Sequence, residues 1–120
     1  MAQPFQDLLV WQRAIEMTVS IYDATRTFPR EEMYGLVSQL RRAAVSVASN
    51  IAEGRGRISQ GEFRQFLGIA QGSNYEVQTQ ILVSKQLKMG EPEQLKQAEK
   101  LSVEVAKMLS AFIASLDSTS

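Results

Sequence analysis

The sequence has no cysteine and no histidine among its 120 residues. The absence of cysteine excludes disulfides, thiol nucleophiles and thiolate metal sites, and it suits a reducing compartment. Without histidine, the chain lacks the side chain that serves most often as a general base and as a metal ligand. Both absences argue against an enzyme, although they leave carboxylate chemistry open.

Long apolar runs are also missing. No stretch approaches the roughly 20 apolar residues that a helix needs to span a bilayer. The first nine residues lack a basic segment followed by an apolar one, which is the pattern of a secretory signal peptide. We therefore expect a cytoplasmic protein with no membrane partner.

Neither sign of charge is in excess, because 13 basic and 13 acidic side chains give a net charge of zero. The charges are nevertheless placed unevenly along the chain. Residues 1–40 carry three basic and five acidic side chains (net −2), residues 41–90 carry seven and three (net +4), and residues 91–120 carry three and five (net −2). This distribution either steers an anionic partner or lets the middle of one chain pack on the flank of another.

Apolar residues recur every three or four positions in four segments, which predicts four amphipathic helices. Pro29, residues 54–57 and Gly90 break the pattern, and Ser59 with Glu62 predicts a capping box where the third helix begins. The connections are short, so consecutive helices should be antiparallel. We predict one all-α domain, an up-down-up-down four-helix bundle, with helices at about 7–27, 30–53, 59–89 and 92–117.

The first three segments carry features that one bundle does not explain. Gly68 and Gly72 lie inside the third helix, where each costs about 1 kcal/mol relative to alanine, so we expect a close helix contact or a kink there. The first segment has two apolar stripes, and the second has an alanine-rich flank outside its a/d seam. One bundle cannot bury all of this surface, so we expect a homo-oligomer. The two stripes are Leu8, Trp11, Ile15, Val19 and Tyr22, and Val10, Ala14, Met17 and Ile21.

Polar residues on otherwise core-like faces form the first candidate site. These polar residues form one line on the second helix and one on the third. If the two lines face each other, Glu53 and Glu76 meet as a carboxylate pair for acid–base catalysis or a di-metal site. The usual di-metal site of a bundle needs histidines, however, and this chain has none. The favoured hypothesis is a hydrogen-bonded network that fixes helix register, with Arg42 neutralising a carboxylate. Its members are Arg42, Ser46, Asn50 and Glu53 on the second helix, and Ser73 and Glu76 on the third.

A group of arginines forms the second candidate site. Arginine suits phosphate recognition, so one hypothesis is a patch that binds RNA or DNA. Five arginines in a chain of zero net charge are few for a nucleic-acid-binding domain. Ion pairs between subunits explain the group as well. The residues are Arg41, Arg42, Arg55, Arg57 and Arg64.

Several motifs resemble those of a known family, the 23S rRNA intervening-sequence proteins. The opening motif FQDLLVWQRA occupies residues 5–14. The central motifs are FPREEMYGL at residues 28–36, QLRRA at 39–43 and SNIAEG at 49–54. The third-helix motif comprises Glu62, Phe63, Phe66, Leu67, Ala70, Gly72, Ser73 and Glu76.

The resemblance implies an antiparallel four-helix bundle that assembles as a homopentamer, and it supplies no catalytic residues. Some relatives of that family are similar to accessory proteins of diversity-generating retroelements, which form basic pentameric barrels that bind RNA and reverse transcriptase. Two departures are visible. The net charge is zero, and Ala48 stands where many members have a proline, so the second helix should run straighter.

Together, the residues and the resemblance predict a non-catalytic, homo-oligomeric scaffold or adaptor, with five copies as the expected number. No cofactor, metal or small-molecule substrate is expected. The alternative is an RNA- or DNA-binding accessory protein that uses the arginine group. A carboxylate enzyme based on Glu53 and Glu76 is the third hypothesis.

Overall fold

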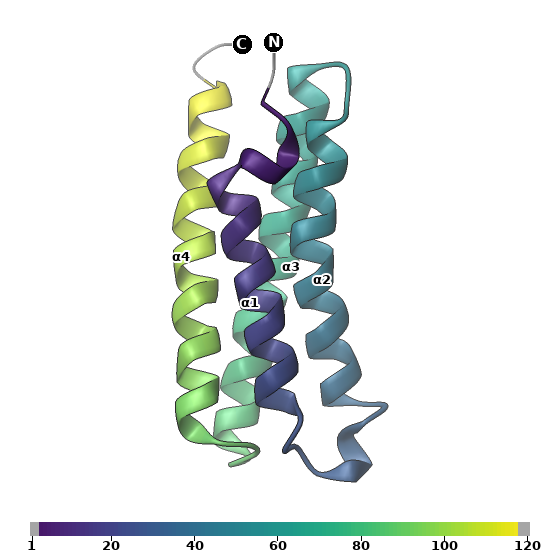
Figure 1. Cartoon of the computed structure of the whole chain (residues 1–120), viewed down its shortest axis with the longest axis vertical. Helices are drawn as coiled ribbons and strands as arrows, with labels where there is room; N and C mark the ends of the chain where they lie inside the picture. Colours follow the sequence, from purple (N-terminus) through teal and green to yellow (C-terminus); the bar gives the residue numbers. More distant parts are fainter. Residues whose placement is uncertain (1–2, 118–120) are drawn as a thin grey trace.

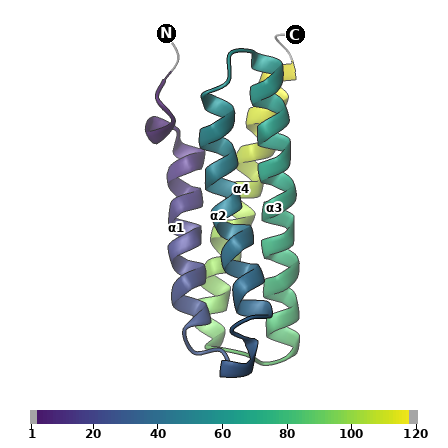
Figure 2. The same ribbon diagram turned by 90° about the vertical axis from the view of Figure 1, so that its right-hand side faces the viewer.

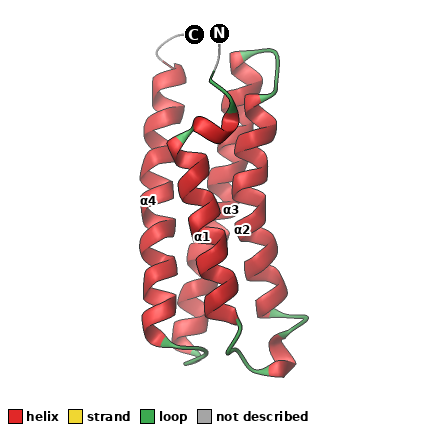
Figure 3. Cartoon of the chain, viewed as in Figure 1, coloured by secondary structure: helices red, strands yellow, loops and turns green. Residues whose placement is uncertain are grey.

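The computed structural model describes residues 3–117 of the chain, and four long helices account for most of them (Figure 1). No strand occurs in this range, as the colouring by secondary structure shows (Figure 3). The predicted all-α four-helix bundle is therefore confirmed. The helices are α1 (Leu9–Thr25), α2 (Leu36–Arg55), α3 (Gln60–Gln86) and α4 (Pro92–Asp117), with 3₁₀ turns η1 (Phe5–Asp7) and η2 (Arg30–Glu32).

The helices run up and down in turn and occupy the corners of a square. Each helix packs against its two neighbours, while no contact within residues 3–117 joins α1 to α3 or α2 to α4. The α2–α3 connection lies at one end, beside the start of α1 and the end of α4, and the other two connections lie at the opposite end (Figures 1 and 2). The bundle measures 46 × 21 × 20 Å. The outer surfaces of α1 and α3 thus lie at opposite corners.

The core consists of aliphatic side chains that each helix contributes at the predicted spacing. Of the two stripes on α1, the one that starts at Val10 is buried. Burial of each large aliphatic side chain contributes roughly 1.5–3 kcal/mol, so this seam supplies the main stabilisation of the bundle. The largest fully buried side chains of the core include Met17, Ile21, Leu40, Ile51, Leu67, Ile81 and Leu109.

The helix ends follow local sequence signals. The predicted N-cap of α3 is present, since the amide of Glu62 donates to Ser59 Oγ at 3.1 Å; the Glu62 carboxylate accepts from the Ser59 hydroxyl at 3.2 Å. After α3, Lys88 has a φ of 56°, a left-handed conformation. This conformation lets the amides of Lys88 and Met89 donate to the carbonyls of Lys85 and Ser84, both at 3.0 Å. The arrangement is a Schellman motif with lysine where glycine is usual.

The second helix begins at Leu36, six residues later than the sequence predicts. After Pro29 the chain makes a 3₁₀ turn, and Gly35, with φ −112° and ψ −109°, then interrupts the helical path. Glu32 therefore precedes α2, and its Oε1 accepts a hydrogen bond from the amide of Leu36 at 3.3 Å. Tyr34 is 96% exposed, so its side chain makes no packing contact that would favour a helical conformation in this turn.

Within the described residues, no helix is long and apolar enough to cross a membrane.

Candidate functional site

Three of the six residues in the predicted polar line form a hydrogen-bonded cluster between α2 and α3. The hydroxyls of Ser46 and Ser73 lie 2.9 Å apart. The amide of Asn50 donates to the carbonyl oxygen and to Oγ of Ser46, at 2.8 and 3.0 Å. The cluster aligns the two helices at one level, which is what a register-fixing network does.

The two carboxylates of that line do not meet. Glu53 lies seven residues beyond Ser46 toward the α2–α3 connection, and Glu76 lies three residues beyond Ser73 in the opposite direction. At 1.5 Å per residue, about 15 Å of helix separates them. Glu53 instead pairs with Arg57 at 2.8 Å. The carboxylate-pair hypothesis therefore has no geometric support.

Arg42 and Glu76 line an open groove between α2 and α3 beside the serine pair. Both side chains are exposed, and no hydrogen bond or ion pair within the described residues holds either one. The expectation that Arg42 neutralises a carboxylate of the network is thus not realised inside one chain. Tyr34, Ser38 and Gln39 complete the polar wall of this groove.

The five arginines of the second candidate site fall into two groups. Arg41 and Arg42 lie in the first third of α2, whereas Arg55 ends that helix, fourteen residues farther on. This spacing corresponds to about 21 Å along the helix. Arg57 and Arg64 lie with Arg55 around the α2–α3 connection. The structure therefore does not gather the arginines into one patch.

Contacts within the chain hold three of these arginines. Arg41 lies 4.5 Å from the ring centroid of Tyr22, and its Nε donates to Thr25 Oγ1 at 2.9 Å. Arg55 lies over the Phe63 ring at 5.3 Å, and its Nε donates to the Gln3 carbonyl at 2.8 Å.

Arg57 lies over the Phe66 ring at 4.7 Å while it pairs with Glu53. Cation–π contacts of this kind typically contribute 0.5–1 kcal/mol or so at exposed sites, about as much as an exposed ion pair. Structural contacts therefore account for the placement of Arg41, Arg55 and Arg57.

A buried polar pair between α3 and α4 is absent from the sequence-based predictions. Asn74 and Ser102 are both fully buried. The Asn74 amide donates to the Ser102 carbonyl at 2.9 Å, and the Ser102 hydroxyl donates to Asn74 Oδ1 at 2.7 Å. Gln71 and Gln78 lie on the same side of α3 and also donate to α4. Gln71, Asn74 and Gln78 are spaced three and four residues apart, and this spacing was the signal from which a polar face toward α4 could have been predicted.

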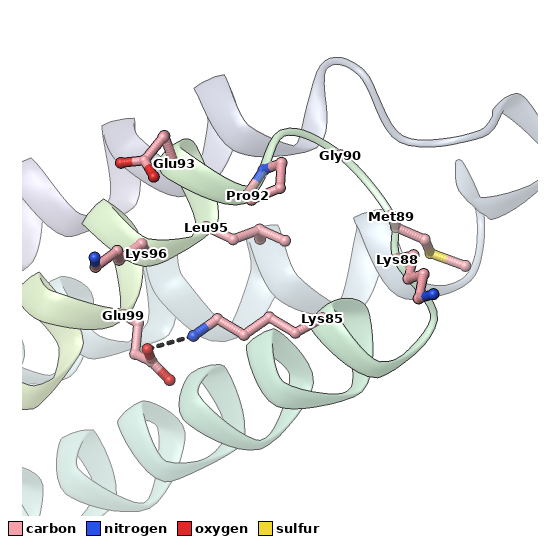
Figure 4. Close-up of a pocket in the computed structure, with 9 residues that line it drawn as sticks. All are labelled: Lys85, Lys88, Met89, Gly90, Pro92, Glu93, Leu95, Lys96 and Glu99. Carbon is pink, nitrogen blue, oxygen red and sulfur yellow. Dashed lines mark hydrogen bonds and ion pairs between the residues drawn. The ribbon is translucent and has the colours of Figure 1, made fainter.

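A hollow in the bundle surface lies at the α3–α4 connection (Figure 4). Leu95 and Met89 form its apolar floor, and Lys85, Lys88 and Lys96 lie around it. The ammonium groups do not converge, because those of Lys88 and Lys96 point outward on opposite sides (Figure 4). Lys85 is neutralised by Glu99, whose Oε1 lies 2.5 Å from Nζ. The lysines around the hollow are therefore not arranged to bind an anion.

Three residues of the second apolar stripe of α1 remain on the surface, whereas Leu8 is buried and Trp11 packs against the core. Ile15, Val19 and Tyr22 are 38%, 56% and 38% exposed, and Val45 of α2, beside Ile15, is 43% exposed. We call these four residues the α1 face. An uncharged groove runs from this face between α1 and α2, lined by Phe5, Trp11, Ile15, Thr18, Val45, Ala48, Ser49 and Ala52.

The alanine-rich flank of α2 is largely accommodated within one chain. Ala43, Ala44 and Ala48 are buried, which leaves mainly Val45 and Ser49 outside. The expected close contact at Gly68 and Gly72 is absent within the described residues, because a Cβ added to either would meet no atom within 4 Å. The large exposed apolar side chains of these three helices are therefore mainly on α1 and α3, and Val45 is the one on α2.

Comparison with known proteins agrees with the motifs. The family model described as 23S rRNA-intervening sequence protein matches residues 6–111. A crystal structure of a protein of unknown function from the S23 ribosomal protein family of Bacteroides thetaiotaomicron is similar, with a TM-score of 0.78 and 22% identity. The similarity covers 88% of this chain and 98% of that one, and it bears on the fold alone. Among curated proteins, none matches.

Proposed function

The chain belongs to the 23S rRNA-intervening sequence protein family, and we propose that it is a non-catalytic helical scaffold of the cytoplasm that assembles with itself. The observation that carries the proposal is the α1 face. An apolar strip of this kind on one helix is unfavourable in water and is typical of a surface that another protein covers. Five copies is the number that the sequence resemblance implies.

The distribution of polar groups supports a non-catalytic role. Ser46, Asn50 and Ser73 hydrogen-bond to one another, and Asn74 is buried against Ser102. Glu53 and Glu76 are too far apart to share a proton or a metal ion. These polar side chains fix the register of the helices. That role suits a scaffold and does not call for a catalytic site.

A charge placed in the α1 face tests self-assembly. Ile15 lies where the α1–α2 groove meets the α1–α4 groove, so Ile15→Glu puts a carboxylate at the centre of the proposed contact. Val103→Glu on α4 is the matched control, because Val103 is 39% exposed against 38% for Ile15. We expect light scattering to give a multiple of 13.4 kDa for the wild type and for Val103→Glu, and 13.4 kDa for Ile15→Glu. Equal masses for the two variants would count against the α1 face.

Binding of RNA or DNA at the α2–α3 end is the second candidate function. Arg55, Arg57 and Arg64 lie together at this end, where residues 53–64 carry three basic and two acidic side chains (net +1). Anisotropy of a labelled single-stranded RNA at about 50 and 200 mM salt would test it, since phosphate contacts weaken steeply with salt. The test variant is Arg55→Ala/Arg57→Ala, and Arg26→Ala/Arg30→Ala at the opposite end is its control. Salt-sensitive binding lost only in the test variant would establish the nucleic-acid function. If the wild type does not bind, this second function is rejected and only the scaffold proposal stands.

A further inference from the structure

Two hydrogen-bonded pairs join α2 and α3, which lie side by side (Figure 2), along one side of the bundle. The first is the Ser46–Ser73 hydroxyl pair at 2.9 Å. Seven residues from each serine, away from the α2–α3 connection, Gln80 Nε2 donates to Gln39 Oε1 at 3.4 Å. Seven residues are about two turns of an α-helix, so the two helices keep one register over this stretch. Residues one turn from the serines on either helix therefore lie at a common level.

Arg42 and Glu76 occupy this intermediate level. Arg42 lies four residues before Ser46 and Glu76 three residues after Ser73, about 6 and 4.5 Å along the bundle in the same direction. Residues three or four apart share one side of a helix, and both residues line the groove between α2 and α3. No hydrogen bond or ion pair within residues 3–117 joins them to each other or to any third residue. Two opposite charges thus flank the groove without meeting.

This open arrangement contrasts with the other facing charges of the bundle. Between α1 and α4, Arg13 Nε lies 2.6 Å from Glu104 Oε1, and between α3 and α4, Lys85 Nζ lies 2.5 Å from Glu99 Oε1. Neither charged residue of the groove has another charged residue three or four positions away on its own helix, where an ion pair could form instead. Both charges of the groove are therefore available to a ligand.

The rest of the groove is polar and uncharged. Its volume of about 560 Å³ lies within the range of small-molecule sites. The hydroxyls of Ser46 and Ser73 carry one proton each, and the bond between them uses only one. The second proton has no acceptor within the part of the chain that the structure describes. Ser38, the Gln39 amide and the Tyr34 hydroxyl add further polar groups to the wall.

We propose that this groove binds a free α-amino acid in its zwitterionic form. The planar guanidinium of Arg42 matches the two oxygens of the ligand carboxylate, and the Glu76 carboxylate accepts hydrogen bonds from the ligand ammonium. A ligand with a single charge is attracted by one of these residues and repelled by the other. The uncharged polar wall favours an uncharged polar side chain, as in serine, threonine, asparagine or glutamine. The site lies within one chain, so it does not depend on self-assembly.

Isothermal titration calorimetry of the wild-type chain tests the site with four probes in turn: L-serine, L-threonine, L-asparagine and L-glutamine. We expect saturable binding of at least one of them, with one site per chain. The N-acetyl derivative of that amino acid lacks the ammonium, and its α-carboxamide lacks the carboxylate. Each derivative should bind about tenfold more weakly or worse, because it has lost one of the two charge-assisted contacts.

Variants of the chain locate the binding. Arg42→Gln and Glu76→Gln each remove one charge from an exposed side chain, and each should weaken the binding about tenfold. Arg26→Gln and Glu93→Gln are matched controls, because both residues are exposed and lie outside the groove. Both controls should bind as the wild type does. Light scattering on the same samples reports assembly separately, so a loss of binding is not confused with a loss of the scaffold.

Binding that requires both charges of the ligand and both charged residues of the groove would support the proposal. If none of the four amino acids binds the wild type, the proposal is overturned, whatever the mass of the chain in solution. Binding that the two derivatives share at equal strength, or that either groove variant leaves unchanged, would overturn it as well.

Discussion

Single residues set how closely these helices approach one another. Gly54, near the end of α2, faces α3 so closely that a methyl group would lie 2.5 Å from Cβ of Phe66 and 3.1 Å from Cδ1 of Phe63. Because Cβ of Phe66 is fixed to the backbone, no rotamer change can relieve that contact. Glycine is required here for space.

Gly54→Ala should destabilise the bundle by about 1–3 kcal/mol, the usual cost of overpacking, because α2 and α3 must move apart. Urea unfolding followed by circular dichroism measures the change. Gly61→Ala is the control, since a Cβ there meets nothing within 4 Å and alanine favours the helix by up to about 1 kcal/mol. A neutral Gly54→Ala would mean that the two helices are less tightly packed than described.

Lys88 is strained by its backbone conformation, with a φ of 56°. Lys88→Gly should raise the free energy of unfolding by about 1 kcal/mol, because glycine adopts this region without a Cβ clash. Lys88→Ala removes the same side chain but keeps Cβ, so we expect little change. The comparison of the two variants by thermal unfolding isolates the backbone term, and an equal gain in both would show that the side chain is responsible.

At the scale of elements, the α3–α4 interface depends on a buried polar pair. Asn74 and Ser102 exchange two hydrogen bonds at 2.9 and 2.7 Å. Either residue, left without the other, has a buried polar group that water cannot reach. The pair fixes the level at which α4 packs on α3.

A double-mutant cycle tests this coupling. Asn74→Ala and Ser102→Ala should each cost about 1–3 kcal/mol, because each leaves a buried partner unsatisfied. The double variant should cost less than the sum by about 1 kcal/mol. Additive losses in urea unfolding would show that the two side chains act independently.

The sequence predicts the elements better than their relations. Apolar spacing predicts four helices and most of the core, because both follow from local periodicity. It misplaces the start of α2, since the spacing from Met33 to Val37 continues smoothly through Gly35, where the backbone leaves the helical region.

Register is not encoded by periodicity, because it depends on which side chains meet across an interface. The sequence therefore finds Ser46 and Ser73 as members of one line but also assigns Glu53 and Glu76 to it, about 15 Å apart along the bundle. It does not find Asn74, whose importance comes from its partner on α4. The excess apolar surface on α1 is predicted correctly because its two stripes are visible in the spacing alone.

At the scale of the whole molecule, one chain buries one of the two stripes of α1 and leaves Ile15, Val19 and Tyr22 of the other exposed. The α1 face and the outer surface of α3, whose only charged side chain between Gln65 and Ser84 is Glu76, lie at opposite corners, while α4 carries much of the surface charge. The proposed self-assembly would cover the exposed apolar part of this surface.

Self-assembly should make thermal stability depend on protein concentration, because mass action favours the associated, folded state. We expect the Tm of the wild type to rise over a hundredfold increase in concentration. The Tm of Ile15→Glu should stay constant, and that of Val103→Glu should follow the wild type. Differential scanning fluorimetry measures all three, and a concentration-independent Tm in the wild type would argue against assembly.

The most direct test of the account is the mass of the wild-type chain in solution. Sedimentation equilibrium at micromolar concentration reports it without reference to shape. The account predicts a discrete species at five times the 13.4 kDa of one chain. A single species of 13.4 kDa that persists as the concentration rises would contradict it.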